Sequence, residues 1–210
     1  MEQLAFRLPQ RGGKRRGAGR KPRGERAGVS HKARPKFEKP TAVHVTLRVD
    51  VHVWNLRSRR CYRRVGECLE EAVGRFGLRV IEYSVMGNHI HLIVEADDQT
   101  ALTRGMQGLS IRIAKALNAM MNSRGSVFDD HYDARLLRTP TELVRAIAYV
   151  LRNHEHHFGT KGRDRFSSDG LPAEHRHTQL AVPVSWLLRI GWRKASAADL
   201  RRLLGSAFAG

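Results

Sequence analysis

Two histidines separated by one residue open an otherwise apolar run, NHIHLIVE, at positions 88–95. Side chains along a β-strand alternate between the two faces of a sheet, so Ile90, Leu92 and Val94 share one face. His89 and His91 share the other face, where their spacing lets both imidazoles reach one ion. A polar strand end that faces water is the plainer alternative. Two adjacent imidazoles without an ion or hydrogen-bond partner are nevertheless unfavourable once either is protonated, which favours a pair of metal ligands.

A second set of polar residues lies in LVRAIAYVLRNHEHH, residues 143–157. At about 100° per residue, one sector of this helix is apolar and is expected to pack on the domain: Leu143, Val144, Ile147, Val150 and Leu151. The opposite side carries Arg145, Tyr149, Arg152, Asn153 and His156. Tyr149 and Asn153 are one turn apart, so the Asn153 amide oxygen is a candidate third ligand for an ion held by the two histidines. This requires the helix to lie over the histidine-bearing face of the sheet.

Together these residue types predict chemistry on a phosphodiester. A divalent ion bound by His89 and His91 would withdraw charge from a non-bridging phosphate oxygen. The Tyr149 oxygen would attack the phosphorus and form a covalent phosphotyrosine, which preserves the phosphodiester energy for resealing without ATP. Arg145 and Arg152 are expected to lower the pKa of the phenol and to hold phosphate oxygens.

The elements that must position these residues follow from hydrophobic spacing and turn signals. The spacing predicts a strand, a helix, two strands, a helix and a strand at residues 42–49, 60–76, 78–86, 89–95, 102–120 and 135–139. Gly77 is expected to end the first helix, and Gly87-Asn88 forms a two-residue hairpin turn. A further helix over about 142–157, capped by Thr141, carries the tyrosine. The order β-α-β-β-α-β predicts an α+β, ferredoxin-like split βαβ fold with an antiparallel sheet and two helices on one face.

The chain is strongly basic, because 38 Lys+Arg against 20 Asp+Glu give a formal net charge of +18 over 210 residues. A field of this sign attracts polyanions, of which nucleic acid is the commonest. Residues 1–40 hold 13 basic and 3 acidic residues and few large apolar side chains, so we expect a disordered basic arm. Four residues of the arm are candidate DNA contacts: Arg15, Arg16, Arg20 and Lys21. An N-terminal arm that only aids solubility is an equal alternative.

Three regions are predicted: the arm at 1–40, a folded domain at 41–158 and a tail at 159–210. The tail is polar and loop-like apart from a short amphipathic helix in DLRRLLGSAF. Cys61 and Cys68 lie two turns apart on one predicted helix, too far for a disulfide, which indicates a reducing compartment. The sequence has no apolar run of about 18 residues and no apolar core of a secretory signal, so we expect no membrane span and a cytoplasmic location.

At these residues the sequence closely resembles the single-tyrosine HUH transposases of small bacterial insertion sequences, together with their REP-associated relatives. The resemblance covers about residues 41–158 and rests on VMGNHIHLIVE and AYVLRN, supported by HVTLR and LTRGMQGLSIRIAKALN. It implies Tyr149 as nucleophile and a metal site of His89, His91 and Asn153. Some of the best-known members have Gln at the position of Asn153, one methylene longer.

The same resemblance implies a cofactor, a substrate and partners. The cofactor is Mg²⁺ or Mn²⁺, and the substrate is single-stranded DNA with hairpins, cut through a 5′-phosphotyrosine. A homodimer is possible, in which the tyrosine helix of one subunit serves the other, and the location is the bacterial cytoplasm in association with the nucleoid. The sequence leaves open whether the site forms within one chain or between two.

Two other functions are compatible with the sequence. A catalytically silent protein on the same fold would bind palindromic DNA repeats. A replication initiator or relaxase of the HUH class would usually be larger and often has two tyrosines, whereas this helix has one. The intact His89, His91 and Tyr149 favour the transposase.

Four further histidines give less specific signals. His44 is a possible extra polar group near the site, with a surface position as the plainer alternative. The cluster His154, His156 and His157 is expected to be mostly a solvated helix end, with His156 on the tyrosine side.

Overall fold

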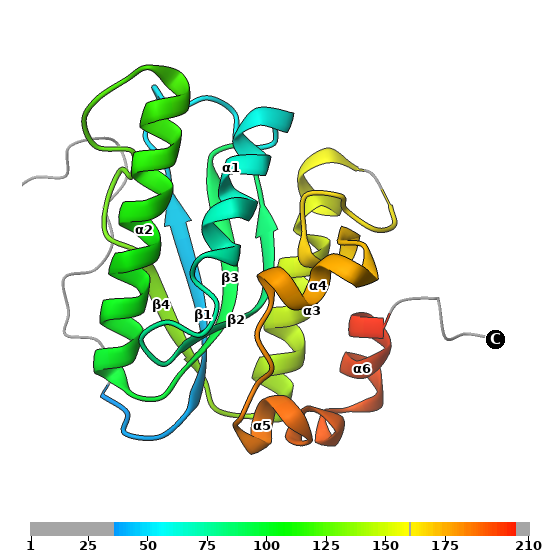
Figure 1. The fold of residues 1–210 in the computed structure, drawn as a ribbon. Coiled ribbons are helices and arrows are strands. Elements are labelled where there is room, and N and C mark those ends of the chain that lie inside the picture. Colours follow the sequence, from blue (N-terminus) through cyan, green and yellow to red (C-terminus); the bar gives the residue numbers. More distant parts are fainter. Residues whose placement is uncertain (1–35, 160, 205–210) are drawn as a thin grey trace, which may run out of the picture.

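A four-stranded antiparallel sheet with strand order β2-β3-β1-β4 forms the centre of the computed structural model, which describes residues 36–159 and 161–204. The strands are β1 (Thr41–Arg48), β2 (Leu78–Val85), β3 (His89–Ala96) and β4 (Asp133–Leu137). Helices α1 (Arg59–Glu70) and α2 (Gln99–Met121) cover one face, and α3 (Pro140–Phe158) lies on the other (Figure 1). The predicted ferredoxin-like arrangement with a tyrosine-bearing helix after it is confirmed.

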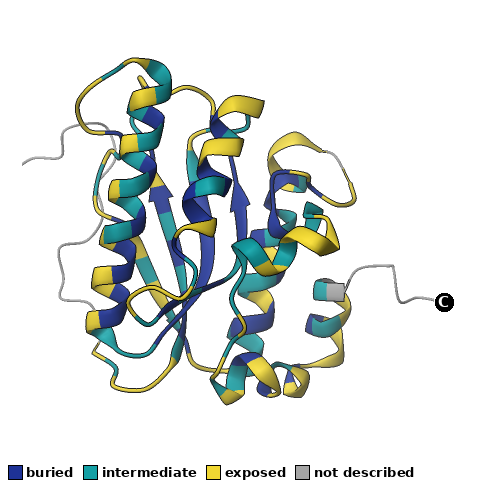
Figure 2. Ribbon diagram, viewed as in Figure 1, coloured by how far each residue is buried: buried dark blue, intermediate teal, exposed yellow. Residues whose placement is uncertain are grey.

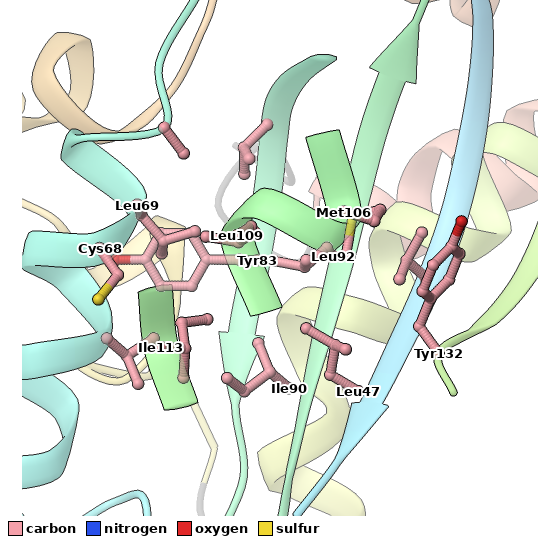
Figure 3. Close-up of a cluster of buried hydrophobic side chains, with 14 of the residues drawn as sticks. Leu47, Cys68, Leu69, Tyr83, Ile90, Leu92, Met106, Leu109, Ile113 and Tyr132 are labelled. Carbon is pink, nitrogen blue, oxygen red and sulfur yellow. The ribbon is translucent and has the colours of Figure 1, made fainter. Parts of the chain in front are cut away.

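Alternate residues of the two central strands form the main core against α1 and α2: Val43, Val45 and Leu47 of β1, and Ile90, Leu92 and Val94 of β3. Figure 3 shows Leu69 of α1 and Leu109 of α2 among the side chains gathered with Tyr83 and Ile90 of the sheet. Burying each such side chain stabilises the fold by about 1.5–3 kcal/mol. These alternate core residues therefore determine which face of β1 and β3 packs against the helices, and the polar residues between them lie on the opposite face.

The second face of the sheet is also covered. A smaller apolar cluster joins it to α3 and to the C-terminal region: Ala42, Ile93, Leu137, Leu143, Val150 and Leu188. The central strand β3 is accordingly buried on both sides over most of its length (Figure 2). The side chains of Arg145 and Glu95 each form hydrogen bonds with residues of the C-terminal region.

The C-terminal region holds more helix than the sequence indicated. It contains 3-10 turns η1 (Ser168–Gly170) and η2 (Gly191–Lys194) and helices α4 (Ala173–Gln179), α5 (Trp186–Arg189) and α6 (Ala197–Leu204). Helical spacing is hard to recognise over so few residues, which explains why only the last of these was expected. The region lines the edge strand β2, where the Val85 N–H donates to the Phe166 carbonyl and the Ala181 N–H to the Val80 carbonyl, both at 2.8 Å.

Two helix boundaries differ from prediction. Helix α1 ends at Glu70 rather than near residue 76, because Gly74 and Phe76 adopt left-handed φ angles of 72° and 58° that a helix cannot continue through. Helix α3 is capped by Thr139, not by Thr141. Thr139 and Glu142 form a reciprocal capping box, and Pro140 occupies the first helical position, where its missing N–H costs nothing.

Residues 1–35, which include Arg15, Arg16, Arg20 and Lys21, lie outside the described residues. Cys61 and Cys68 are both buried free thiols. Among the helices of residues 36–159 and 161–204, none combines the length and the hydrophobicity that crossing a bilayer requires.

Candidate active site

The two histidines of β3 lie at the middle of the second sheet face. In the antiparallel register, His91 is opposite Thr46 of β1 and His89 is opposite Arg48. The two imidazole rings are 4.7 Å apart between centroids and nearly perpendicular. His91 is only 5% exposed, and His89, the first residue of β3, is partly buried, so the pair is not a strand end that lies freely in water.

Hydrogen bonds engage the same ring nitrogen in both histidines. His89 Nδ1 is 2.8 Å from Asn88 Oδ1, an oxygen that can only accept, so this nitrogen donates and Nε2 keeps its lone pair. His91 Nδ1 is 3.1 Å from the Thr46 hydroxyl and 3.3 Å from His44 Nε2. The buried Nε2 of His91 has no hydrogen-bond partner among the described residues. Metal-ligating imidazoles are held in this way, with one nitrogen fixed by a neighbour and the other directed at the ion.

The electrostatics of the site keep the imidazoles neutral. Burial, reinforced by His157 and Arg48, lowers the pKa of His89 to about 4. Burial, reinforced by the neighbouring His89, His44 and His157, lowers the pKa of His91 to about 3. Burial also lowers the pKa of His44. At neutral pH the lone pairs of the two β3 histidines are therefore available for an ion.

Helix α3 brings Tyr149 to these histidines within the same chain. The tyrosine ring is 5.2 Å from the His91 ring and 5.9 Å from the His44 ring, edge to face in both cases. Tyr149 is 45% exposed, so a substrate can reach its hydroxyl. The helix thus lies over the histidine-bearing face, as the sequence required, and these ring contacts are made within one chain.

Asn153 lies one turn beyond Tyr149 and is 1% exposed. Tyr149 and His157, one turn to either side of it, contact the rings of His91 and His89, the latter at 5.9 Å. Asn153 therefore faces the space beside the histidine pair. Its Nδ2 position is buried without a hydrogen-bond partner among the described residues, and the amide oxygen and nitrogen are interchangeable by rotation.

His157, not His156, is the C-terminal histidine that joins the site. Tyr149, Asn153 and His157 are spaced four residues apart, so they lie along nearly the same side of α3. This side faces β3, where the His157 ring contacts the His89 ring. His156 is exposed. The helix end is not solvated on every side, because Asn153 and His154 are both buried.

The two arginines of α3 differ. Arg145 Nε lies 2.8 Å from Oδ1 of Asp199, so this guanidinium binds α6 rather than being free for a phosphate. Arg152 is partly buried and makes no hydrogen bond or ion pair with another described residue. Arg152 is therefore the better placed of the two to hold a phosphate oxygen.

Sequence reasoning missed several side chains that complete the site. For His44 the surface was the favoured position and a place near the site the alternative; it contacts both His91 and Tyr149. Thr46 and Asn88 were not singled out at all. The available signal was the alternation in HVT, which puts His44 and Thr46 on one face of β1, but only the pairing of β1 with β3 brings them to His91.

A scan against models of known protein families matches residues 41–150 to the family described as "Transposase IS200 like". The chain belongs to the IS200-like transposase family. The match begins with β1, includes both β3 histidines and extends to the residue after Tyr149. The family assignment makes this chain a DNA-processing enzyme of the transposase class.

One of the similar solved structures shares the fold of this IS200-like transposase. The REP-associated tyrosine transposase bound to a REP hairpin matches with a TM-score of 0.57 and 13% identity, over 75% of this chain and 94% of that chain. A putative transposase from Deinococcus radiodurans R1 gives a TM-score of 0.40 and 14% identity, over 55% of this chain and 90% of that chain. No match was found among the curated proteins.

The residues present fit a divalent ion that also binds a phosphate. Within the described part of the chain, no group of three or more His, Cys, Asp or Glu side chains is placed to hold a metal ion. Two imidazoles and one amide form a sparser set, in which His91 Nε2 and Asn153 Nδ2 are both buried without a hydrogen-bond partner among the described residues. Such a set leaves coordination positions for water and substrate oxygens, as Mg²⁺ sites on phosphates commonly do.

Proposed function

We propose that this transposase cleaves and rejoins single-stranded DNA at hairpin ends through a 5′-phosphotyrosine on Tyr149. The observation that carries the proposal is the position of the half-exposed Tyr149 ring, 5.2 Å from His91 in the same chain. The net charge of +18 supports a nucleic-acid substrate. The hairpin is inferred from family membership together with the similar fold of a transposase that was solved with a REP hairpin.

The proposed step is a displacement at phosphorus. A Mg²⁺ or Mn²⁺ ion held by His89, His91 and Asn153 would supply Lewis-acid stabilisation of the charge on the phosphate oxygens. The Tyr149 oxygen attacks the phosphorus, the new O–P bond forms, and the bond from phosphorus to the 3′-oxygen breaks. The phenol proton passes to solvent, and the leaving 3′-oxygen gains a proton. Rejoining is the reverse, with a 3′-hydroxyl attacking and Tyr149 leaving.

The side chains around Tyr149 have separate tasks in this step. Arg152 holds a phosphate oxygen by charge-assisted hydrogen bonds. Asn88 and Thr46 keep the imidazoles in one orientation through their Nδ1 atoms. The tight packing of α3 between the sheet and the C-terminal region fixes the distance from the nucleophile to the histidines, which favours attack on a bound phosphate.

The decisive experiment is covalent capture. The protein is incubated with Mn²⁺ and a panel of single-stranded DNAs that carry hairpins with single-stranded flanks, and adducts are separated by denaturing electrophoresis. We expect an adduct with the wild type and none with Tyr149→Phe, because the phenol oxygen is the nucleophile. Tyr62→Phe is the matched control, since Tyr62 lies on α1 and bonds to Tyr83 in the main core.

Two results would overturn the proposal. One is an adduct that persists in Tyr149→Phe. The other is tight binding of hairpins with no adduct across the panel and across Mg²⁺ and Mn²⁺, which would instead indicate a catalytically silent DNA-binding protein.

A further inference from the structure

A hollow of about 390 Å³ opens beside His89. Its lining comes from the loop before α1, the β2–β3 turn and the end of α3, and includes Val53, Asn55, Met86, Asn88, His157 and Phe158. Pockets of about 300–1,000 Å³ are the usual size of sites for small organic molecules. The tyrosine chemistry proposed above does not use this space.

Ring contacts place the hollow at the far end of the site from Tyr149. The tyrosine ring contacts His91, the His91 ring contacts His89, and the His89 ring contacts His157, which lines the hollow. The order along the site is therefore nucleophile, histidine pair, hollow. A phosphate bound at the histidine pair would have Tyr149 on one side and the hollow on the other.

The walls of the hollow suit a flat, largely apolar ring. Val53 and Met86 are buried apolar residues at 9% and 1% exposure, whereas the Phe158 ring is 52% exposed. The Arg57 guanidinium lies 4.7 Å from the Phe158 centroid and is itself held by two hydrogen bonds to Asp164, at 2.7 and 2.8 Å. Phe158 is thus a supported aromatic surface with uncovered area, and nucleobases stack on such surfaces whatever their sequence.

The hollow also offers hydrogen-bond donors. Asn55 Oδ1 accepts from the Arg57 backbone N–H at 2.9 Å, and Asn88 Oδ1 accepts from His89 at 2.8 Å. The NH₂ group is the donor of an asparagine side chain, and neither of the hydrogen bonds above uses it, so both NH₂ groups remain to donate. All four nucleobases carry acceptor atoms on their edges, so donors at the rim match a base.

We propose that this hollow binds the nucleobase of the nucleotide immediately 5′ of the cut, the one whose 3′-oxygen leaves. The inference rests on the proposed function, because it uses the position of Tyr149 as nucleophile. Attacking and leaving oxygens lie roughly in line across the phosphorus. The leaving nucleotide therefore extends away from Tyr149, toward His89 and the hollow, where its base stacks on Phe158.

The first test uses small probes and requires no catalysis. The four deoxynucleoside 3′-monophosphates are compared with 2-deoxyribose 3-phosphate, which lacks a base, and with the 5′-monophosphates, by NMR titration in the presence of Mg²⁺. We expect the 3′-monophosphates to bind about 5- to 150-fold more tightly than the sugar phosphate. Phe158→Ala should remove this advantage, and Phe158→Trp should retain it.

The proposal is overturned if the base adds nothing to affinity, or if Phe158→Ala binds all probes as the wild type does. It is also overturned if the 5′-monophosphates exceed the sugar phosphate in affinity by as much as the 3′-monophosphates do. Each of these outcomes is independent of whether Tyr149 forms an adduct.

The second test uses a hairpin DNA whose cut position has been mapped from the covalent adduct. An abasic nucleotide is placed immediately 5′ of the cut, or as a control immediately 3′ of it. With the wild type, we expect the substrate with the 5′ abasic nucleotide to form adduct about 5- to 150-fold more slowly than the intact substrate. With Phe158→Ala, the two substrates should form adduct at the same rate. If the wild type forms adduct at equal rates on all substrates, the hollow does not bind the base, while the proposed function still stands.

Discussion

His91 depends on β1 for its orientation. Its Nδ1 is 3.1 Å from the Thr46 hydroxyl and 3.3 Å from His44 Nε2, and its Nε2 is buried without a partner among the described residues. An imidazole that binds an ion through Nε2 carries its proton on Nδ1, so the Thr46 oxygen and His44 nitrogen act as acceptors. Under the proposed function, in which His91 binds the ion, Thr46 is therefore a positioning residue for His91.

Thr46→Val tests this role, because valine has nearly the same shape and suits a strand but cannot accept a hydrogen bond. We expect Mn²⁺ affinity, measured by titration without DNA, to fall about 10-fold, at the low end of outer-shell substitutions because His44 remains. Thr46→Ser, which keeps the hydroxyl, should bind Mn²⁺ as the wild type does. Unchanged affinity in Thr46→Val would show that the hydrogen bond does not position His91.

Burial of His91 also makes a pH-dependent contribution to stability. Its pKa is lowered to about 3 in the fold, against about 6.5 in an unfolded chain, so between these values the unfolded state binds more protons. The contribution is fully present above about pH 6.5 and is lost as pH falls toward 3, by up to about 1.4 kcal/mol per pH unit.

Urea unfolding of the metal-free protein at about pH 4.5 to about pH 7, which covers the upper part of the interval between the two pKa values, measures this slope. His91→Gln removes the titrating ring, so the free energy of unfolding should depend less steeply on pH in the variant than in the wild type. Parallel pH profiles for the two proteins would show that His91 is not buried as a neutral group.

At the scale of elements, β3 holds the C-terminal region through one buried carboxylate. Glu95 is fully buried and accepts hydrogen bonds from the backbone N–H groups of Ser185 and Val184, at 2.7 and 2.8 Å, and from Arg79. Burial alone would raise the pKa of Glu95, but these bonds outweigh it and hold the pKa below its usual value. Glu95 therefore joins the sheet to the segment that leads into α5.

Glu95→Gln should lower the free energy of unfolding at pH 7 by about 3 kcal/mol, since it leaves Arg79 with one fewer buried partner. Hydrogen exchange around residues 180–190 should rise. Because the folded pKa is depressed, this contribution is present above about pH 4.5 and declines as pH falls through the folded value. Glu67→Gln is the control: its ion pairs with Arg63 and Arg64 are on the surface, so about 1 kcal/mol or less is expected.

Elements that carry their own local signal were predictable. The four strands and α2 follow from periodicity, and Gly87-Asn88 predicts the turn, because each depends on residues close in sequence. The cap of α3 illustrates the limit: Thr139 and Thr141 both precede an apolar run, and only Glu142, three residues after Thr139, distinguishes them.

The candidate site was predictable in part for the same reason. His89, His91, Tyr149 and Asn153 reveal themselves through spacing within one element. Their neighbours depend on contacts between distant segments: His44 and Thr46 reach His91 through the pairing of β1 with β3, and Arg145 is engaged by Asp199, 54 residues away. Hydrophobic periodicity depends on residues close in sequence and carries no information on contacts between distant segments. The sequence therefore could not show which polar residues on these elements contribute to the site.

At the scale of the whole molecule, the net charge is unevenly placed. Residues 1–35 hold 11 basic and 2 acidic residues, so they carry +9 of the total +18. We propose that this segment contacts phosphates, in addition to the site on the sheet. Each phosphate neutralised releases counterions, so binding weakens with salt in proportion to the number of contacts.

Deleting residues 2–35 should therefore reduce the slope of log affinity against log salt, by about 0.7 for each lost contact on single-stranded DNA. Fluorescence anisotropy with a labelled hairpin DNA, from low to physiological salt, measures the slope. A milder variant replaces Arg15, Arg16, Arg20 and Lys21 with alanine and should show a part of the same change. Covalent adduct formation at low salt should persist in both, because the Tyr149 site lies wholly within the folded domain. An unchanged slope would show that the segment does not contact phosphates.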